Sequence, residues 1–204
     1  MPVPTVYILT RTSRRPAAFN SCRISVLGQE TSLAKIVHVI GTDRPSDTYF
    51  SGDIVVPLDP PHRKECFYNL YVNHMMNVAH RHGPGFFMVL DDDDRFACED
   101  AIDTIFSRPI ASGNIVLWRV QFKKRLIPER AYFGKPPVKA HISGIGYMAH
   151  TSHRRIGQWT IKPHGDFMGI RGLYEHLDPI WLKSVLTKTQ DGRHKGRAEQ
   201  AWSK

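Results

Sequence analysis

The chain has 204 residues, of which 41% are hydrophobic, and Lys plus Arg exceed Asp plus Glu by 28 to 19, for a formal net charge of +9. This composition can bury a core, which excludes a wholly disordered protein. No apolar run approaches the ~20 residues that cross a bilayer, so we expect no stable membrane insertion. The surplus of positive charge favours polyanionic or phosphorylated partners.

The cysteines and the N-terminus both indicate a reducing compartment. Cys22, Cys66 and Cys98 are odd in number and widely spaced, so they form no disulfide framework and no CxxC pair. The apolar patch over 6–9 ends at Arg11 and is too short for the core of a signal peptide. We therefore expect a cytoplasmic protein.

Strand and helix signals alternate in the first half of the chain. A β-branched and aromatic run over 5–9 predicts the first strand. Pro16 and Gly28 bound a helix, since proline favours the first turn and glycine the position after the last. The apolar runs 35–40 and 53–56 predict the next two strands.

The second predicted helix is the best defined, because apolar residues recur along 64–82 with the helical period. The continuous apolar run 86–90 predicts a strand that is buried on both faces. Residues 1–97 therefore indicate a β-α-β-β-α-β order and a mostly parallel sheet. Beyond them we expect a short helix, two strands and a terminal helix, at 100–106, 114–122, 141–149 and 180–186.

The domain prediction is a single α/β domain over 1–187 and a basic tail over 188–204. The tail is polar and rich in Lys and Arg. It is either a disordered end or a lid that folds over the site.

Polar side chains follow the predicted parallel strands where each strand ends. They are Thr10, Arg11 and Thr12 after the first strand, Asp43 after the second, and Asp91–Asp94 after the buried one. Ligands of open α/β sheets bind outside the carboxyl ends of the strands. We therefore expect these side chains to form one site.

The four consecutive aspartates predict a metal site. Their charges repel one another, and a divalent cation would relieve that repulsion. Carboxylate oxygens select hard cations such as Mn²⁺ or Mg²⁺. In an extended segment, Asp91 and Asp93 would share one side, and Asp92 and Asp94 the other. The alternative is a solvated acidic turn.

Several other residues carry two interpretations. Arg11, Arg14 and Arg15 are either surface charges before a helix or phosphate contacts at its N-terminus. His164 lies two residues before Asp166 and is a candidate metal ligand or contact of a diphosphate.

The glycine-rich segment 143–147 is either a strand that another backbone approaches closely or an acceptor loop. In the second case Trp118, Tyr147 or Trp159 would offer a stacking face. His150 and His153 have a metal-ligand spacing for a helix, but their surroundings indicate strand and loop.

The chain resembles the nucleotide-sugar glycosyltransferases of the GT-A fold, and family 2 in particular. TVYILTRTSRRPAAFNSCRISVLGQ resembles their first strand, nucleotide-binding loop and first helix, and VHVIGTD their second strand with its aspartate. FFMVLDDDDRF resembles the DxD segment, and HGDFMGI a later segment with an acidic residue near the acceptor. The resemblance covers about residues 5–170, and the compact size is similar to small stand-alone domains of large DNA viruses and bacteria.

The resemblance implies a Rossmann-like α/β fold, with a mixed, mostly parallel sheet flanked by helices. It implies that Asp93 and Asp91 ligate the metal, although Asp92 or Asp94 can replace them because the run leaves the register open. The residues that would bind the donor nucleotide are Thr10, Arg11, Thr12, Asp43, Asp91 and Asp92.

The resemblance also implies a general base, Asp166, with Glu175 and Asp178 as reserves. The base would take the proton of the acceptor hydroxyl.

The function so implied is a metal-dependent transfer of a sugar from a nucleoside-diphosphate donor to a hydroxyl of a glycan or glycoconjugate, with inversion. UDP is favoured, and dTDP and GDP stay open.

Two alternative functions predict features that differ from those of this sequence. A metal-dependent nucleotidyltransferase would favour a Gly- and Lys-rich phosphate loop after the first strand, which this sequence lacks. A nucleic-acid-binding protein would interleave basic and aromatic residues on one face. The basic residues here are scattered, so we expect no nucleic-acid partner.

Overall fold

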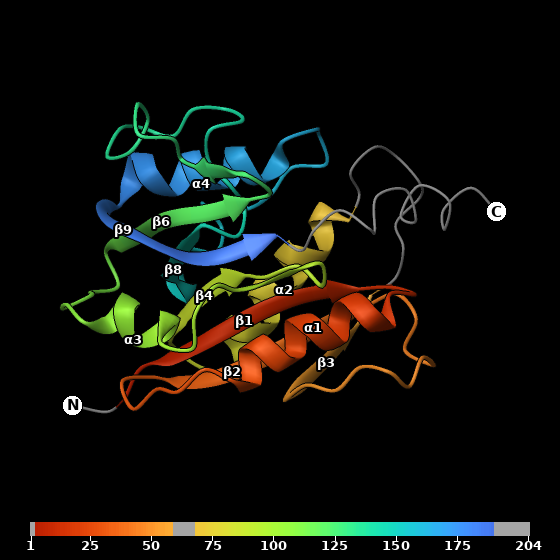
Figure 1. The fold of residues 1–204 in the computed structure, drawn as a ribbon. Helices are drawn as coiled ribbons and strands as arrows, with labels where there is room; N and C mark the ends of the chain where they lie inside the picture. Colours follow the sequence, from red (N-terminus) through yellow and green to blue (C-terminus); the bar gives the residue numbers. More distant parts are fainter. Residues whose placement is uncertain (1–2, 59–67, 190–204) are drawn as a thin grey trace.

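The computed structural model describes residues 3–58 and 68–189, and the strands of these ranges form one nine-stranded sheet (Figure 1). The strands are β1 (Thr5–Thr12), β2 (Lys35–Thr42), β3 (Ile54–Pro57), β4 (Phe86–Val89), β5 (Asp94–Phe96), β6 (Asn114–Phe122), β7 (Arg125–Ile127), β8 (Tyr147–His150) and β9 (Asp178–Thr189). Their order is β3-β2-β1-β4-β8-β6-β9-β5, and β7 pairs with β6.

The sheet is mixed and mostly parallel, as predicted. β3, β2, β1 and β4 are parallel neighbours. β8 runs antiparallel between β4 and β6, and β9 is parallel to β6. Six of the nine described strands, namely β1, β2, β3, β4, β6 and β9, therefore point the same way. Their carboxyl ends meet at one edge of the sheet.

Helices cover both faces of the sheet (Figure 1). They are α1 (Pro16–Leu27), α2 (Asn69–His82), α3 (Ala101–Phe106) and α4 (Gly165–His176). α1 and α3 pack on the cluster that contains Val6 and Ile8, whereas α2 and α4 pack on the cluster that contains Tyr7 and Leu9. This division follows from the period of two along β1, which sends alternate side chains to opposite faces.

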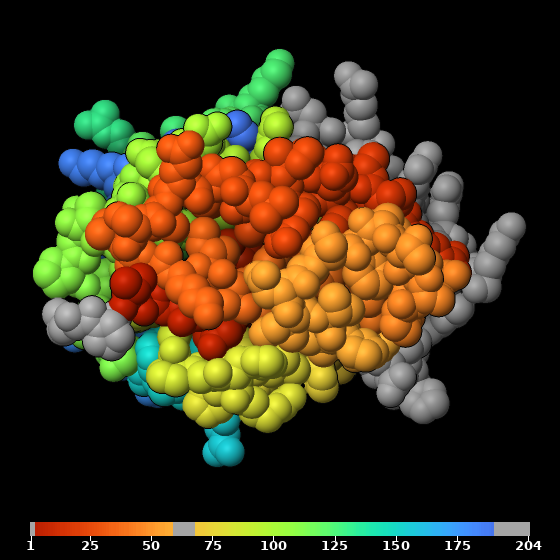
Figure 2. Space-filling model, turned by 90° about the horizontal axis from the view of Figure 1, so that it is seen from below, coloured from red at the N-terminus to blue at the C-terminus, as the bar shows by residue number. Residues whose placement is uncertain are grey.

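Seen from below, the surface consists mainly of the segments up to β3 and of α2 (Figure 2). Within 3–58 and 68–189, no helix has the length and apolar composition that crossing a membrane requires.

The predicted terminal helix at 180–186 is wrong, because these residues belong to β9. The register between β6 and β9 shifts on both sides of Arg119, so that β9 carries extra residues there. Leu182 and Leu186 are buried while Ser184 between them is exposed, so burial here departs from the strand period of two and resembles a helical spacing. β9 also runs to Thr189, and the rest of the predicted tail lies outside the described residues.

Two other predicted elements are shorter in the structure. The predicted strand 141–149 contains β8 only, because residues 143–146 form a turn in which Gly146 N–H bonds the Ser143 carbonyl at 3.0 Å. The helix predicted over 64–82 is α2 from Asn69 onward, and residues 64–67 lie outside the described ranges.

Candidate active site

Two arginines bind the four-aspartate segment after β4. Arg11, in β1, donates from Nε to Asp91 Oδ1 at 2.7 Å and from Nη2 to Oδ2 of the same carboxylate. Arg15 lies 2.8 Å from Asp92 Oδ1 and 2.6 Å from Asp93 Oδ2. Because β1 and β4 are neighbours, the carboxyl end of β1 supplies the positive charge that the aspartates need.

Burial alternates along the aspartate segment. Asp91 and Asp93 are partly exposed, whereas Asp92 and Asp94 are 2% and 7% exposed. Burial raises the pKa of Asp92 to about 7, against the opposing effect of Arg15. Burial, with the other aspartates, also raises the pKa of Asp94 well above its usual range.

A cavity of about 380 Å³ opens in front of this segment. Its polar lining comes from five parts of the chain and includes Arg11, Asp91, Asp93, Asp94, Lys123, Ser143, His164 and Asp166. Its aromatic lining consists of Tyr68, Phe122 and Trp159. Arg11 also lies over two of these rings, 5.0 Å from the Tyr68 centroid and 5.3 Å from that of Trp159.

Thr10 lies in the interior beside the cavity, where it belongs to a buried hydrogen-bond chain. Arg23 Nη1 donates to His38 Nδ1 at 2.8 Å, so the proton of this imidazole is on Nε2. His38 Nε2 donates to Thr10 Oγ1 at 2.8 Å, and Thr10 donates to the Leu90 carbonyl at 2.7 Å. Burial, and then Arg23, lower the pKa of His38 to about 3. The chain holds the backbone next to Asp91.

Thr12 and Asp43 lie away from this cavity, toward the end of β2. Thr12 is buried and its hydroxyl lies 3.0 Å from the Tyr49 hydroxyl. Asp43 Oδ1 is buried, and among the described residues it accepts no hydrogen bond. Tyr49 also lines a second cavity of about 500 Å³, together with Arg14 and Arg44.

Asp166 is held at the cavity by close backbone contacts in the first turn of α4. A Cβ at Gly165 would lie 2.0 Å from the Thr160 carbonyl oxygen, so only glycine lets Thr160 pass this close to the helix. A Cβ at Gly144 would lie 2.9 Å from Trp159 Cη2 and 3.2 Å from Asp166 Cβ.

The environment of Asp166 makes its carboxylate a stronger base. Burial raises its pKa, although the Phe167 N–H, Arg11 and His164 oppose this shift. A higher pKa brings a carboxylate closer to what general-base catalysis requires.

The two reserve residues lie elsewhere. Glu175 is exposed near the other end of α4 and pairs with Arg171 at 2.7 Å. Asp178 begins β9, at the amino ends of the parallel strands, and pairs in register with Asn114.

The three candidate stacking residues are buried, although Trp159 lines the cavity, and two other aromatic rings are more exposed there. Trp118 and Tyr147 are 0% exposed, and Trp159 is 5% exposed. The cavity instead offers Phe122 and Tyr68, which are 40% and 44% exposed. Sequence reasoning missed both, along with Lys123. Phe122 has a signal in retrospect, because a large apolar residue there ends the run of β6 directly before two lysines.

Among residues 3–58 and 68–189, no three His, Cys, Asp or Glu side chains are arranged to hold a metal ion. His150 and His153 therefore belong to no such group among the described residues. His150 Nδ1 instead accepts the Ser152 N–H at 3.3 Å, at the start of the 3₁₀ turn Thr151–His153.

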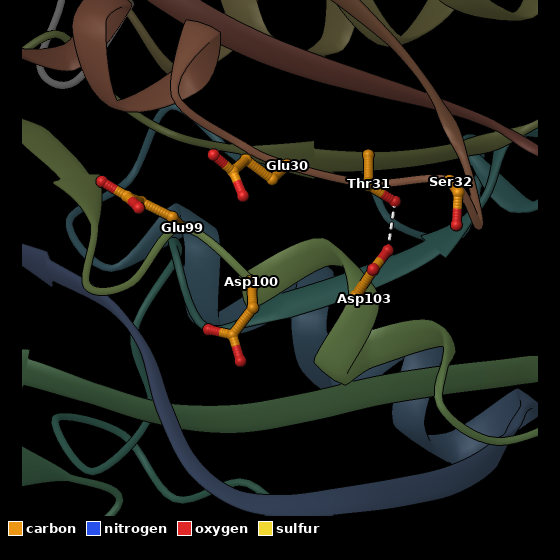
Figure 3. Close-up of a pocket in the computed structure, with 6 residues that line it drawn as sticks. All are labelled: Glu30, Thr31, Ser32, Glu99, Asp100 and Asp103. Carbon is orange, nitrogen blue, oxygen red and sulfur yellow. Dashed lines mark hydrogen bonds between the residues drawn. The ribbon is translucent and has the colours of Figure 1, made fainter.

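A separate acidic hollow lies at the amino ends of the strands (Figure 3). It is lined by Glu30, Thr31, Ser32, Glu99, Asp100 and Asp103. Thr31 donates a hydrogen bond to Asp103 across it, between the start of β2 and the start of α3 (Figure 3). The hollow is thus at the opposite edge of the sheet from the four aspartates.

Solved structures of TarS from S. aureus have a similar fold. TarS 1–349 in complex with UDP matches with a TM-score of 0.64 and 13% identity, over 91% of this chain and 60% of that one. Its complex with UDP-GlcNAc matches with a TM-score of 0.60 and 12% identity, over 91% of this chain and 58% of that one. A longer TarS structure matches with a TM-score of 0.63 and 10% identity, over 91% of this chain and 36% of that one.

These comparisons show the class of fold, which is the GT-A-like mixed α/β fold expected from the sequence. The chain spans 60% or less of the length of these TarS structures. Its sequence matches no protein-family model and, at a significant level, no curated protein.

Proposed function

We propose that the protein is a glycosyltransferase that moves a sugar from a nucleoside-diphosphate donor, with UDP favoured, to a hydroxyl of a glycan or glycoconjugate. The observation that carries this proposal is the convergence of Arg11, Asp91, Asp93 and Asp166 on one cavity at the carboxyl ends of β1 and β4. The GT-A-like fold, shared with a protein solved with UDP and UDP-GlcNAc, supports the choice of donor.

The nucleotide would lie along the carboxyl ends of β1, β2 and β4. Asp43 would accept a hydrogen bond from the base, and its buried oxygen without a described partner supports this role, since a buried acceptor is costly to leave unpaired. Arg11 would face the nucleotide from the cavity, while Thr10 and Thr12 support the loop behind it.

Mn²⁺ or Mg²⁺ is the proposed cofactor, with Asp93 and Asp91 as its ligands. Their donor set fits such a cation, because Mg²⁺ is held by one or two carboxylates together with substrate phosphates. Asp93 is the more accessible of the two, with 44% of its side chain exposed, and would exchange Arg15 for the cation. The bound cation would neutralise charge on the departing diphosphate.

Asp166 is the proposed general base. Its carboxylate would take the proton of the acceptor hydroxyl as that oxygen bonds the anomeric carbon of the donor sugar. One base and attack from the side opposite the diphosphate would invert the anomeric centre.

Calorimetric titration of UDP tests the proposal, first with Mn²⁺ and then with EDTA. We expect UDP to bind only when Mn²⁺ is present. In Asp93→Asn, the affinity for UDP should fall and should no longer depend on Mn²⁺. A screen of UDP-sugars, with NMR of the product anomer, then tests transfer and inversion. No binding of UDP, dTDP or GDP in either condition would contradict the proposed function.

A further inference from the structure

Lys123 lies next to the aspartate segment, although it is distant from it in sequence. The Lys123 N–H donates to Thr189 Oγ1 at 3.2 Å. Thr189, at the end of β9, pairs in register with Asp94 of β5. All three residues line the cavity. Since neighbouring strands lie about 4.8 Å apart, the four-carbon stem of Lys123 can reach the space in front of the aspartates.

The backbone of Lys123 has a conformation that favours glycine. Lys123 and Lys124 form the two-residue turn between β6 and β7, and the φ of Lys123 is +55°. Glycine, asparagine and aspartate dominate such positions in two-residue hairpins. A lysine in this conformation strains the backbone and destabilises the fold, and backbone strain of this kind clusters at ligand sites. The side chain of Gln121 holds this turn, since its Nε2 donates to the Lys123 carbonyl.

A diphosphate that enters the cavity needs a positively charged side chain to offset its charge. Four carboxylates line the cavity, and the guanidiniums of Arg11 and Arg15 are bound to Asp91, Asp92 and Asp93. Lys123 adds an ammonium group to the lining of the cavity, 5.8 Å from the centroid of the exposed Phe122 ring.

We propose that Lys123 binds the diphosphate of the nucleotide-sugar donor and stabilises it as it departs. This inference rests on the proposed function. In the transfer, the bond from the anomeric carbon to the diphosphate oxygen breaks and its electron pair stays on that oxygen. The acceptor oxygen bonds the same carbon and its proton goes to Asp166. The Lys123 ammonium donates hydrogen bonds to the diphosphate oxygens, and these bonds strengthen as negative charge develops.

The test compares the binding of UDP with that of uridine, which lacks the phosphates. Lys123→Gln should weaken UDP binding about tenfold to hundredfold, the range for a hydrogen bond to a charged group, and leave uridine binding unchanged. Lys123→Arg should keep most of the UDP affinity, because the charge is retained. Lys124→Gln is the matched control, since Lys124 is exposed in the same turn and does not line the cavity. The control should bind both ligands like the unmodified protein.

A second variant separates binding from folding. Lys123→Gly removes the ammonium group and relieves the strained backbone, because glycine adopts a positive φ readily. We therefore expect a higher melting temperature together with the same loss of UDP affinity as in Lys123→Gln.

Equal UDP affinity in the unmodified protein and Lys123→Gln would overturn the inference. So would a normal UDP affinity with a raised acceptor KM, because the lysine would then serve the acceptor. If the unmodified protein binds UDP and uridine with equal affinity, no group in the cavity binds the diphosphate, and the inference also fails. An unmodified protein that binds no nucleotide would overturn the proposed function itself.

Discussion

Arg11 binds both carboxylate oxygens of Asp91, and this pair joins the carboxyl ends of β1 and β4. The two side chains are 15% and 22% exposed, so the pair is largely removed from water. The same guanidinium donates to the Tyr68 carbonyl at 3.1 Å. Arg11 therefore organises the wall of the cavity as well as balancing the charge of the aspartate.

Arg11→Gln should lower the free energy of unfolding by about 3 kcal/mol, because it leaves the Asp91 carboxylate without its partner in a poorly solvated place. The double variant Arg11→Gln/Asp91→Asn should lose less than the sum of the single variants. Urea denaturation measures both. The control is Arg171→Gln, which breaks an exposed pair and should cost about 0.5 kcal/mol or less. Additive losses would contradict a coupled pair.

Asp166→Asn should keep UDP binding and lose transfer by about two to four orders of magnitude, because the amide cannot accept the acceptor proton. The rate of UDP release in the presence of acceptor is the measurement. Glu175→Gln, on the same helix but outside the cavity, should leave that rate unchanged. Full activity of Asp166→Asn would exclude it as the base.

Gly144→Ala should reduce transfer more than it reduces stability. The added Cβ would meet Trp159 at 2.9 Å and the Cβ of Asp166 at 3.2 Å, so that Asp166 must move from its position. We expect a fall in kcat with the Kd of UDP unchanged. Gly113→Ala is the control, because a Cβ there meets no atom within 4 Å. An unchanged kcat in Gly144→Ala would show that the position of Asp166 tolerates this shift.

His38 should make the protein less stable in mild acid. Its folded-state pKa of about 3 is below the ordinary value of 6.5, so between these pH values the unfolded chain binds a proton that the folded chain does not. The free energy of unfolding therefore falls as the pH drops below 6.5, by about 2 kcal/mol from pH 7 to pH 5. His38→Gln should lack this contribution when urea denaturation is compared at the two pH values. The same pH dependence in both proteins would contradict a buried neutral His38.

Short-range signals in the sequence were sufficient for much of the first half of the fold. The apolar run before Asp91 predicted a buried strand, and Pro16 and Gly28 predicted the bounds of α1 within a residue. These features depend on burial and backbone preference over a few neighbouring residues. Such short-range preferences are visible in the order of residues along the chain. The same signals failed for β9, because its irregular pairing with β6 gave the spacing of a helix.

The sequence by itself determined which residue types follow the strands of the parallel sheet, and hence that acidic and basic groups meet at one edge. Only the tertiary structure decided which of them touch. Arg15 reaches Asp92 and Asp93 through the pairing of β1 with β4, and Asp166 approaches the cavity because glycine allows a close backbone contact at Gly165. Lys123 joins the site only through the register of β9 with β5. These contacts link residues far apart in sequence, and their geometry depends on sheet register and packing that no local period encodes.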